Sequence, residues 1–505
     1  MRLGRKQLFT NYKEITRDNL LDVLRKVVPD HNANSTDIDY LIKYEAGEVT
    51  PIREKVYRKD IANFIPDPIA NYIVEFKLGF EWGNPITFVQ SDDDDVEDND
   101  TLTKALSMLN QNYRAQKIKT KQQQMARFLE ICGVAYTYVD TNMEWQDGDS
   151  FFTVDVIDPR WGFVVRSNAF TDKRVILGVV FHKDDDGEFH YTCFTRTTRF
   201  EVKGTTEIER EDMNPLGRIP VIEWIRSYDR QGCFERLIPM IDDVTFTVSS
   251  FLDDVQSNTD AIWFGTDIEF PKEVVTLEDG TTQEVTIKPK NGEWALAYSS
   301  KDGKAPTLKP LSIDYDYQGI LENIASTRNH IWRLAHVPQR NDNSGGSTGV
   351  AMDDAAGWTD AEAEACRKQM LSDSSKMEEV AVVLAAVRIS PYIKQDNPLV
   401  QLKYSDVAPN FKRSKTYDLV SKCNSFATML SHGFALEDLV ANIPLFEDGS
   451  QVVARSGEGV RKYQESIWAK SNEADGGEGE NPVNADRLQA DLSDQIGNSE
   501  ALRAG

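Results

Sequence analysis

Cysteine is scarce in this sequence of 505 residues, and the five that occur are widely scattered: Cys132, Cys193, Cys233, Cys366 and Cys423. No two of them form a Cys-x-x-Cys pair, so their spacing gives neither a disulfide framework nor a cysteine-based zinc site. Isolated thiols of this kind are typical of reduced, buried cysteines in an intracellular protein.

Long hydrophobic runs are also missing. The longest uninterrupted apolar stretch is Val380–Val387, far below the roughly 20 residues that a membrane-spanning helix needs. Residues Met1–Lys6 lead into polar sequence without the apolar segment of a signal peptide. We therefore expect a soluble protein that is neither secreted nor bound to a membrane.

The motifs of several enzyme classes are absent. The segment Gly345–Gly349 is rich in glycine but lacks the lysine of a phosphate-binding loop, and no Gly-x-Ser-x-Gly or His-Glu-x-x-His pattern occurs. The acidic run Ser91–Asp100 lacks the spaced ligands and the glycine turn of a calcium loop. His182 and His190 flank an acidic turn, but histidines at strand ends beside a loop are commonly surface residues. We expect no catalytic residue, no cofactor and no metal.

Charge of one sign predominates. Acidic residues outnumber basic ones 82 to 57, which gives a formal net charge of −25. Tight binding to duplex DNA requires lysine and arginine to displace counterions from phosphates, so the balance argues against a conventional DNA-binding protein. It is compatible with a protein that encloses DNA and lets it slide past repulsive walls, and equally with an acidic surface that only confers solubility.

The length favours several domains, and the first 232 residues predict a mixed α+β domain. A helix is expected from Thr16 to Val28, stopped by Pro29, and a long polar helix from about Thr101 to Cys132. Apolar and β-branched segments between turn formers then predict strands at 134–139, 152–157, 162–165, 175–181 and 190–194.

From Phe234 the pattern becomes helical. An apolar stripe predicts a long helix, with Asp253 and Asp254 mostly outside the stripe. Strands are expected next, including a hairpin around Asp279-Gly280 and a third strand at 294–298, and then a helix at 318–335. Further along, the pattern predicts a helix with a capping box at 359–362, a strand at 399–404, helices at 415–430, 436–443 and 451–470, and a polar C-terminal tail.

A helix, a β-rich insert and a second helix that ends in the polar loop Asn341–Gly349 form a lever-like arrangement rather than a catalytic pocket. Several segments resemble portal proteins of tailed double-stranded DNA bacteriophages of the siphophage type. The matching segments, in order, are Asn71–Ile86, Gly133–Tyr138 with Ile157–Pro159, Asn214–Trp224 leading into Gly232–Glu235 and Ile241–Asp243, and Val337-Pro338 with Ser347–Met352.

This resemblance implies a fold of α+β class with the architecture of a portal subunit. The expected parts are an α/β wing at 1–232, a first stem helix at 233–262, a β-rich clip at 263–316, a second stem helix at 317–335, a tunnel loop at 336–358, a long wing helix and return strand at 359–410, a helical crown at 411–471 and a disordered acidic tail at 472–505.

The resemblance also implies the function and the partners. Family members form a dodecameric ring at one capsid vertex of the virion, assembled in the cytoplasm of the host bacterium. Double-stranded DNA passes through the ring without sequence specificity, driven by the terminase large subunit, and leaves by it on ejection. The major capsid and scaffolding proteins surround the ring, and a head-completion adaptor and tail proteins later dock on it.

Three groups of residues follow as candidate sites. The DNA-facing loop comprises Asn341, Asp342, Asn343, Ser344, Gly345, Gly346, Ser347 and Thr348, and the clip docking surface comprises Lys272, Lys288, Lys290, Trp294, Lys301 and Lys304. The third group, Arg328 and Arg333, either places a weak basic ring in an acidic tunnel or pairs with Asp253 and Asp254.

Other interpretations of the same features remain open. The β-rich insert is also consistent with an ordinary subdomain packed on its own chain, the loop with a plain surface loop, and the helical stripe with monomer core. An acidic-site enzyme acting on nucleic acid or nucleotide, through the turn at 184–188 or the glycine loop, is the alternative from a different class. Another phage connector ring is the third possibility.

Overall fold

The computed structural model describes residues 3–49, 62–91, 100–259, 316–339, 357–411 and 419–432. It also describes the backbone of short strands between 263 and 310 and isolated positions between 434 and 462. The chain divides into two compact units, residues 1–414 and 415–505. It is a mixed α+β protein, as the sequence predicts.

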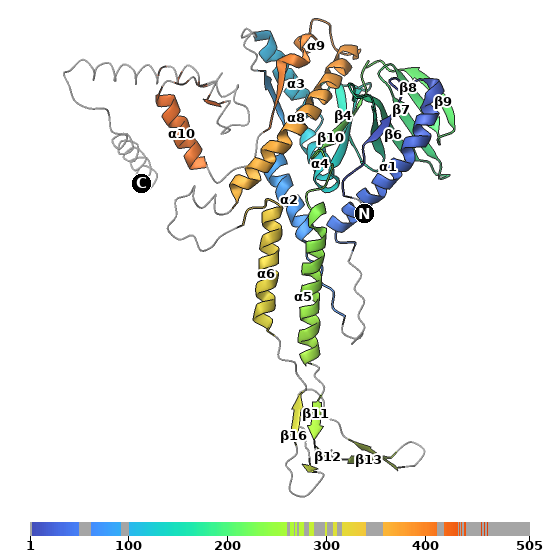
Figure 1. Cartoon of the computed structure of the whole chain (residues 1–505). Helices are drawn as coiled ribbons and strands as arrows, with labels where there is room; N and C mark the ends of the chain where they lie inside the picture. Colours follow the sequence, from blue (N-terminus) through green and yellow to red (C-terminus); the bar gives the residue numbers. More distant parts are fainter. Residues whose placement is uncertain are drawn as a thin grey trace, which may run out of the picture. The chain divides into compact units, whose positions relative to one another are not determined.

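A six-stranded sheet carries the first hydrophobic core (Figure 1). Its order is β1 (Leu8–Thr10), β5 (Gly162–Ser167), β6 (Val175–Lys183), β7 (Phe189–Phe194), β8 (Thr198–Lys203) and β9 (Glu207–Met213), antiparallel except for the β1–β5 pair. Helix α1 (Arg17–Glu45) buries Leu20, Leu24 and Val27 in this core. The edge strand β9 is mostly polar and exposed, which disfavours pairing with another strand.

A second sheet lies within the larger core. Its order is β10 (Val221–Ile225), β3 (Val134–Thr141) and β4 (Phe152–Ile157). Helices α2 (Ile69–Trp82), α4 (Ile118–Cys132) and α8 (Trp358–Ile389) contribute to the same core. Helix α8 contacts both β3 and β10, so an element from late in the sequence completes the domain that the sequence places within residues 1–232.

Helix α1 continues through Pro29, so the predicted stop at this residue is wrong. Proline in a helix interior removes one backbone hydrogen bond and costs about 3 kcal/mol. The apolar face resumes beyond it with Ile38 and Leu41, both fully buried, and their burial outweighs the local cost.

Two further predictions are corrected by the structure. The long helix at 101–132 is two helices, α3 (Asp100–Ala115) and α4, because Lys117 takes a left-handed conformation with φ 57° and redirects the chain. The return strand is not at 399–404, where Asn397 caps the short helix α9 (Pro398–Gln401). It is β17 (Val407–Asn410), which pairs with β2 (Thr87–Gln90).

Helices α5 (Ile238–Thr259) and α6 (Tyr317–Leu334) pack side by side (Figure 1). Between them lie three two-stranded pairs: β11 (Trp263–Thr266) with β16 (Thr307–Pro310), β12 (Ile268–Glu269) with β15 (Tyr298–Ser299), and β13 (Lys272–Thr276) with β14 (Thr282–Thr286). The last pair confirms the predicted hairpin. Most of the predicted third strand at 294–298 lies outside the described residues.

Helix α8 begins at Trp358, after Gly357, whose φ of 86° suits glycine. The start is therefore one residue before the predicted capping box, and Gly357 takes the capping position. In the second unit, α10 (Leu419–Ser431) matches the predicted helix at 415–430, whereas the other predicted helices fall largely, and the tail entirely, outside the described residues. None of the helices in the described ranges combines the length and hydropathy that a bilayer span requires.

Candidate functional site at the foot of the helix pair

The helix pair formed by α5 and α6 is the part of the described structure that the sequence singles out for function. Its members touch through Phe251 and Tyr317, whose rings meet edge to face at 5.6 Å. The apolar stripe predicted on α5 is buried at the start of the helix, at Ile241 and Val244, and becomes more exposed toward Val255. The start of α5, which we call the foot of the helix pair, is thus packed into the larger hydrophobic core.

A short extended segment, residues 63–67, runs along α5, and we call it the strap. The backbone N–H groups of three alternate strap residues donate to side chains spaced four apart on the helix. Asn63 donates to Asp253 at 2.7 Å, Ile65 to Ser249 at 3.2 Å and Asp67 to Thr245 at 3.4 Å. Two extended residues advance about 6.6 Å and four helical residues about 6 Å, so the two repeats match.

The residues that receive the strap are buried polar groups. Thr245, Ser249 and Asp253 are 4%, 0% and 2% exposed, so the helix presents a polar line to the strap where an apolar one would leave N–H groups without acceptors. Asp253, which the sequence places mostly outside the apolar stripe, is nevertheless buried, because the strap covers the side of α5 that carries it. The four-residue spacing of Thr, Ser and Asp was the sequence signal that could have revealed this line.

Arg328 joins the second helix to the strap. Its Nε and a terminal nitrogen bond Asp67 at 2.8 and 2.6 Å, and the side chains are 41% and 14% exposed. Asp67 thus replaces the partners that the sequence suggested, Asp253 and Asp254. Arg333, in the last turn of α6, is exposed and has no ion-pair partner among the described residues.

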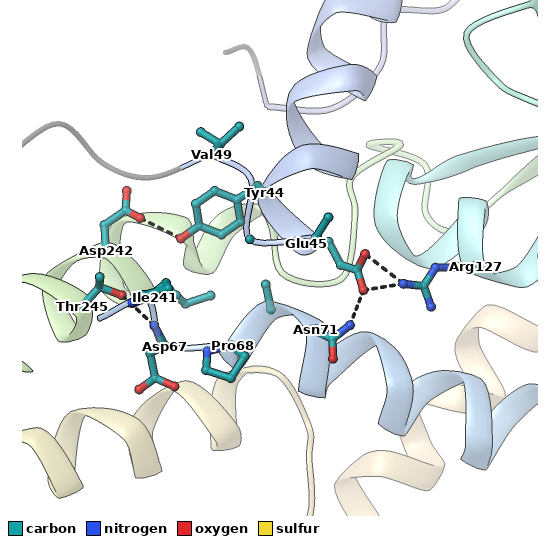
Figure 2. Close-up of a pocket in the computed structure, with 14 residues that line it drawn as sticks. Tyr44, Glu45, Val49, Asp67, Pro68, Asn71, Arg127, Ile241, Asp242 and Thr245 are labelled. Atoms are coloured by element: carbon teal, nitrogen blue, oxygen red, sulfur yellow. Dashed lines mark hydrogen bonds and ion pairs between the residues drawn. The ribbon is translucent and has the colours of Figure 1, made fainter. Parts of the chain in front are cut away.

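A cavity of about 490 Å³ opens beside the strap, between the end of α1, the start of α2 and α5 (Figure 2). The Tyr44 hydroxyl donates to Asp242 at 2.7 Å. Glu45 accepts from the Asn71 side chain, and both of its carboxylate oxygens accept from one terminal nitrogen of Arg127. Burial raises the pKa of Asp242, although the bond from Tyr44 opposes this. These polar groups hydrogen-bond to one another and so link α1 to α2, α4 and α5. They do not form a pair of free reactive groups facing the cavity.

Beside the helix pair, six charged side chains form a buried alternating ring, which we call the charge ring. Lys368 contacts Glu81 at 2.6 Å and Glu130 at 3.1 Å, and Arg226 contacts Glu130 at 2.9 Å. Glu364 accepts from both Arg226 and Lys77, and Lys77 lies 3.9 Å from Glu81, which closes the ring. The members come from α2, α4, α8 and the end of β10: Lys77, Glu81, Glu130, Arg226, Glu364 and Lys368.

Neighbouring charges shift the pKa of Glu364 and of Lys368 toward their charged forms, whereas burial raises the pKa of Glu81. Burial alone raises the pKa of Glu364, but Lys368, Lys77 and Arg226 outweigh it and hold that pKa at about 2. Burial opposes the charge of Lys368 as well, yet Glu130 and Glu81 raise its pKa to about 12. Fixed charges of this kind are suited to holding elements together rather than to transferring protons.

The turn that carries the enzyme alternative has a structural role. Asp184, Glu188 and His190 bring donor atoms within 4.8 Å of one another. Asp184 caps the hairpin by accepting from the Glu188 backbone at 2.7 Å and from His190 at 3.0 Å, and Lys203 pairs with Glu188 at 2.5 Å. The cluster therefore closes the β6–β7 turn through contacts among its own side chains and backbone.

The remaining predicted site residues are not described in detail. Lys272 lies in β13, whose backbone alone is described. The loop residues Asn341–Thr348 lie outside the described residues, and so do Lys288, Lys290, Trp294, Lys301 and Lys304.

Comparison with known proteins identifies the family. A family model described as phage portal protein, SPP1 Gp6-like, matches residues 24–465. A comparison with curated proteins found no match. The family match confirms the resemblance that the sequence motifs indicated.

Proposed function

Because the chain belongs to the phage portal proteins of the SPP1 Gp6-like family, its role is that of a phage portal protein, and we propose that identical copies form a ring at one capsid vertex. The ring is the channel through which double-stranded DNA enters the prohead and later leaves. The observation that carries this proposal is the family match over residues 24–465, most of the chain. The family is structural rather than enzymatic.

The order of elements supports a portal subunit. An α+β body is followed by α5, paired strands, α6 and the long α8, the order that the proposed architecture requires. We assign the wing to 1–232, the stem helices to 233–262 and 317–335, and the clip to 263–316. The tunnel loop, long wing helix with return strand, crown and tail are assigned to 336–358, 359–410, 411–471 and 472–505.

The channel is proposed to work by contact without sequence recognition. Short polar side chains in Asn341–Thr348 reach phosphate or sugar and carry no base-specific pattern. Acidic side chains on the channel wall, supplied by a chain whose net charge is −25, repel the phosphates, so the DNA slides. Arg333 is available as a channel cation, whereas Arg328 is engaged by Asp67.

The clip is the proposed docking surface. The segment 265–310 has eight acidic and six basic residues, closer to neutrality than the whole chain, which suits exchange of partners. We propose that the terminase large subunit docks there during packaging and the head-completion adaptor afterwards, while the major capsid and scaffolding proteins surround the ring. Assembly takes place in the host cytoplasm and ends in the virion.

Electron microscopy of the purified protein tests the ring. Particles with a central hole and radial symmetry are expected, and a compact monomer at concentrations and in surroundings that support capsid assembly would reject the proposal.

Deletion of residues 341–348 tests the channel contact. Rings are expected to persist while DNA packaging or retention falls, because only the loop is removed. Packaging at the wild-type level would reject the role of the loop.

A further inference from the structure

The described elements on either side of residues 340–356, α6 and α8, contact one stripe of helix α2. Tyr72, Phe76 and Phe80 are spaced four apart, so they share one face of that helix. Trp332, in the last turn of α6, meets Tyr72 with ring centroids 5.1 Å apart. Trp358, the first residue of α8, meets Phe76 at 5.9 Å and Phe80 at 5.6 Å.

The aromatic contact at the start of α8 is a small core of its own. Phe80 is buried with Ala361 and Ala365, and Phe76 and Trp358 pack against them. Ala361 and Ala365 lie one turn apart on α8, and their small side chains leave room for the Phe80 ring. The first turns of α8 are therefore held by α2.

The charge ring sets the register of that contact. Lys77 and Glu81 lie four residues apart on α2, and their partners Glu364 and Lys368 lie four apart on α8 with the opposite order of charge. Moving α8 by one turn would place Lys368 against Lys77, or Glu364 against Glu81. Like charges would then meet where the native ones are nearly inaccessible, a strongly unfavourable arrangement.

We propose that α2 fixes the positions of the two elements that flank the 340–356 segment, and we call this role of α2 the platform. Trp332 and Trp358 pack on α2, and the charge ring fixes the register of α8 against it. This inference rests on the proposed function, because it assigns positioning residues for the DNA-facing loop. Tyr72, Phe76, Phe80, Trp332 and Trp358 act through the loop and do not themselves touch DNA.

A distance measurement tests the platform independently of DNA. Spin labels are placed at the exposed positions Arg333 and Asp360, with the exposed Cys366 and Cys423 replaced by serine. Labelled copies are diluted into unlabelled rings, so that only distances within one subunit are read. A single narrow distance is expected.

Two changes then show whether α2 or the loop sets the distance between the labels. Inserting a Gly-Ser pair after Gly346 should leave the distance unchanged, because α2 and not the loop sets it. Trp358→Ala should broaden the distribution, and Trp358→Phe should keep it narrow. A distance that shifts with loop length, or one unaffected by Trp358→Ala, overturns the proposal. Where Trp358→Ala prevents ring assembly, Phe76→Leu supplies the same comparison.

A packaging assay connects the platform to function. Rings of Trp358→Ala are expected to lose packaging to the level of the 341–348 deletion. The matched control is Trp145→Ala, which removes a tryptophan stacked on Phe151 and Tyr392, outside the α2 stripe, and should retain packaging. Wild-type packaging by Trp358→Ala while the loop deletion is impaired overturns the positioning role. An unimpaired loop deletion instead rejects the DNA-contact function, and the distance measurement still decides the platform.

Discussion

His31 is a buried imidazole held among aromatic rings. Its ring centroid lies 4.5 Å from that of Phe163 and 5.5 Å from that of Phe181, and Nε2 is 3.1 Å from the Arg160 carbonyl oxygen. Burial lowers the pKa of His31 from 6.5 to about 4, although the bond to Arg160 opposes the change. The neutral ring donates from Nε2 to that carbonyl, so folding favours the uncharged form.

The stability of the first core should therefore fall in mild acid. Above pH 6.5 His31 is neutral in both states, and between pH 6.5 and 4 the unfolded chain binds the proton first, so the free energy of unfolding decreases by up to about 3 kcal/mol. His31→Gln has no proton to bind in this range. Urea unfolding from pH 7.5 to 4 should show a steeper loss for the wild type, and parallel curves would contradict the assignment.

Asp253 should contribute more to the stability of the fold than its sequence neighbour Asp254. Its Oδ1 accepts from both the backbone and the side chain of Asn63, and it is 2% exposed. Asp253→Ala should cost about 1–3 kcal/mol, because strap donors lose a buried acceptor. Amide hydrogen exchange at residues 63–67 and the thermal midpoint measure the effect. Asp254→Ala, one residue along, is the control, and an equal loss in both would show that the strap is not specifically held.

Pro29 lies inside helix α1 and shows that tertiary packing can stabilise a helix despite an interior proline. The residue is exposed, while Val27 and His31 on either side are buried. Pro29→Ala restores a backbone donor and should stabilise the fold by about 1–3 kcal/mol, less than the full helix penalty because proline also restrains the unfolded chain. Lys26→Ala, exposed on the same helix, should change stability little. A loss of stability in Pro29→Ala would contradict this account.

The elements that sequence predicted well have patterns that need only their own residues. The hairpin between β13 and β14 follows from Asp279-Gly280 between alternating strands, and α5 and α6 from their apolar periodicity. The errors arose where contacts between residues far apart in sequence determine where a helix begins or ends. Burial carries α1 across Pro29, and different neighbours draw α3 and α4 apart at Lys117, since α3 contacts β2 and α9 whereas α4 contacts α2 and β3.

The candidate site was predictable only in outline for the same reason. Arg328 lies in the helix that the pattern at 318–335 predicts, yet its partner Asp67 is 261 residues away in sequence. The charge ring joins residues from 77 to 368, each of which looks like an ordinary surface charge in its own segment. Spacing on one helix suggests a line of residues, but only the fold reveals what faces it.

At the scale of the whole molecule, buried and exposed charges have different roles. In the charge ring three cations meet three anions, so it adds nothing to the net charge of −25. The excess of acid must therefore lie elsewhere, much of it on surfaces such as the β6–β7 turn, where Asp185 and Asp186 are exposed. If repulsion by the channel walls lets DNA slide, packaging depends on where an acidic residue lies and not on the net charge of the chain.

Two substitutions of identical charge separate position from total. Asp342→Lys and Asp186→Lys each raise the net charge from −25 by two units, the first in the proposed channel loop and the second in the exposed turn of the six-stranded sheet. Asp342→Lys should slow DNA packaging and increase DNA retention, more so at low salt, because a lysine in the channel pairs with phosphates. Asp186→Lys should package at the wild-type rate. Equal slowing by both would show that bulk charge governs packaging, and slowing by neither would remove the loop from the channel wall.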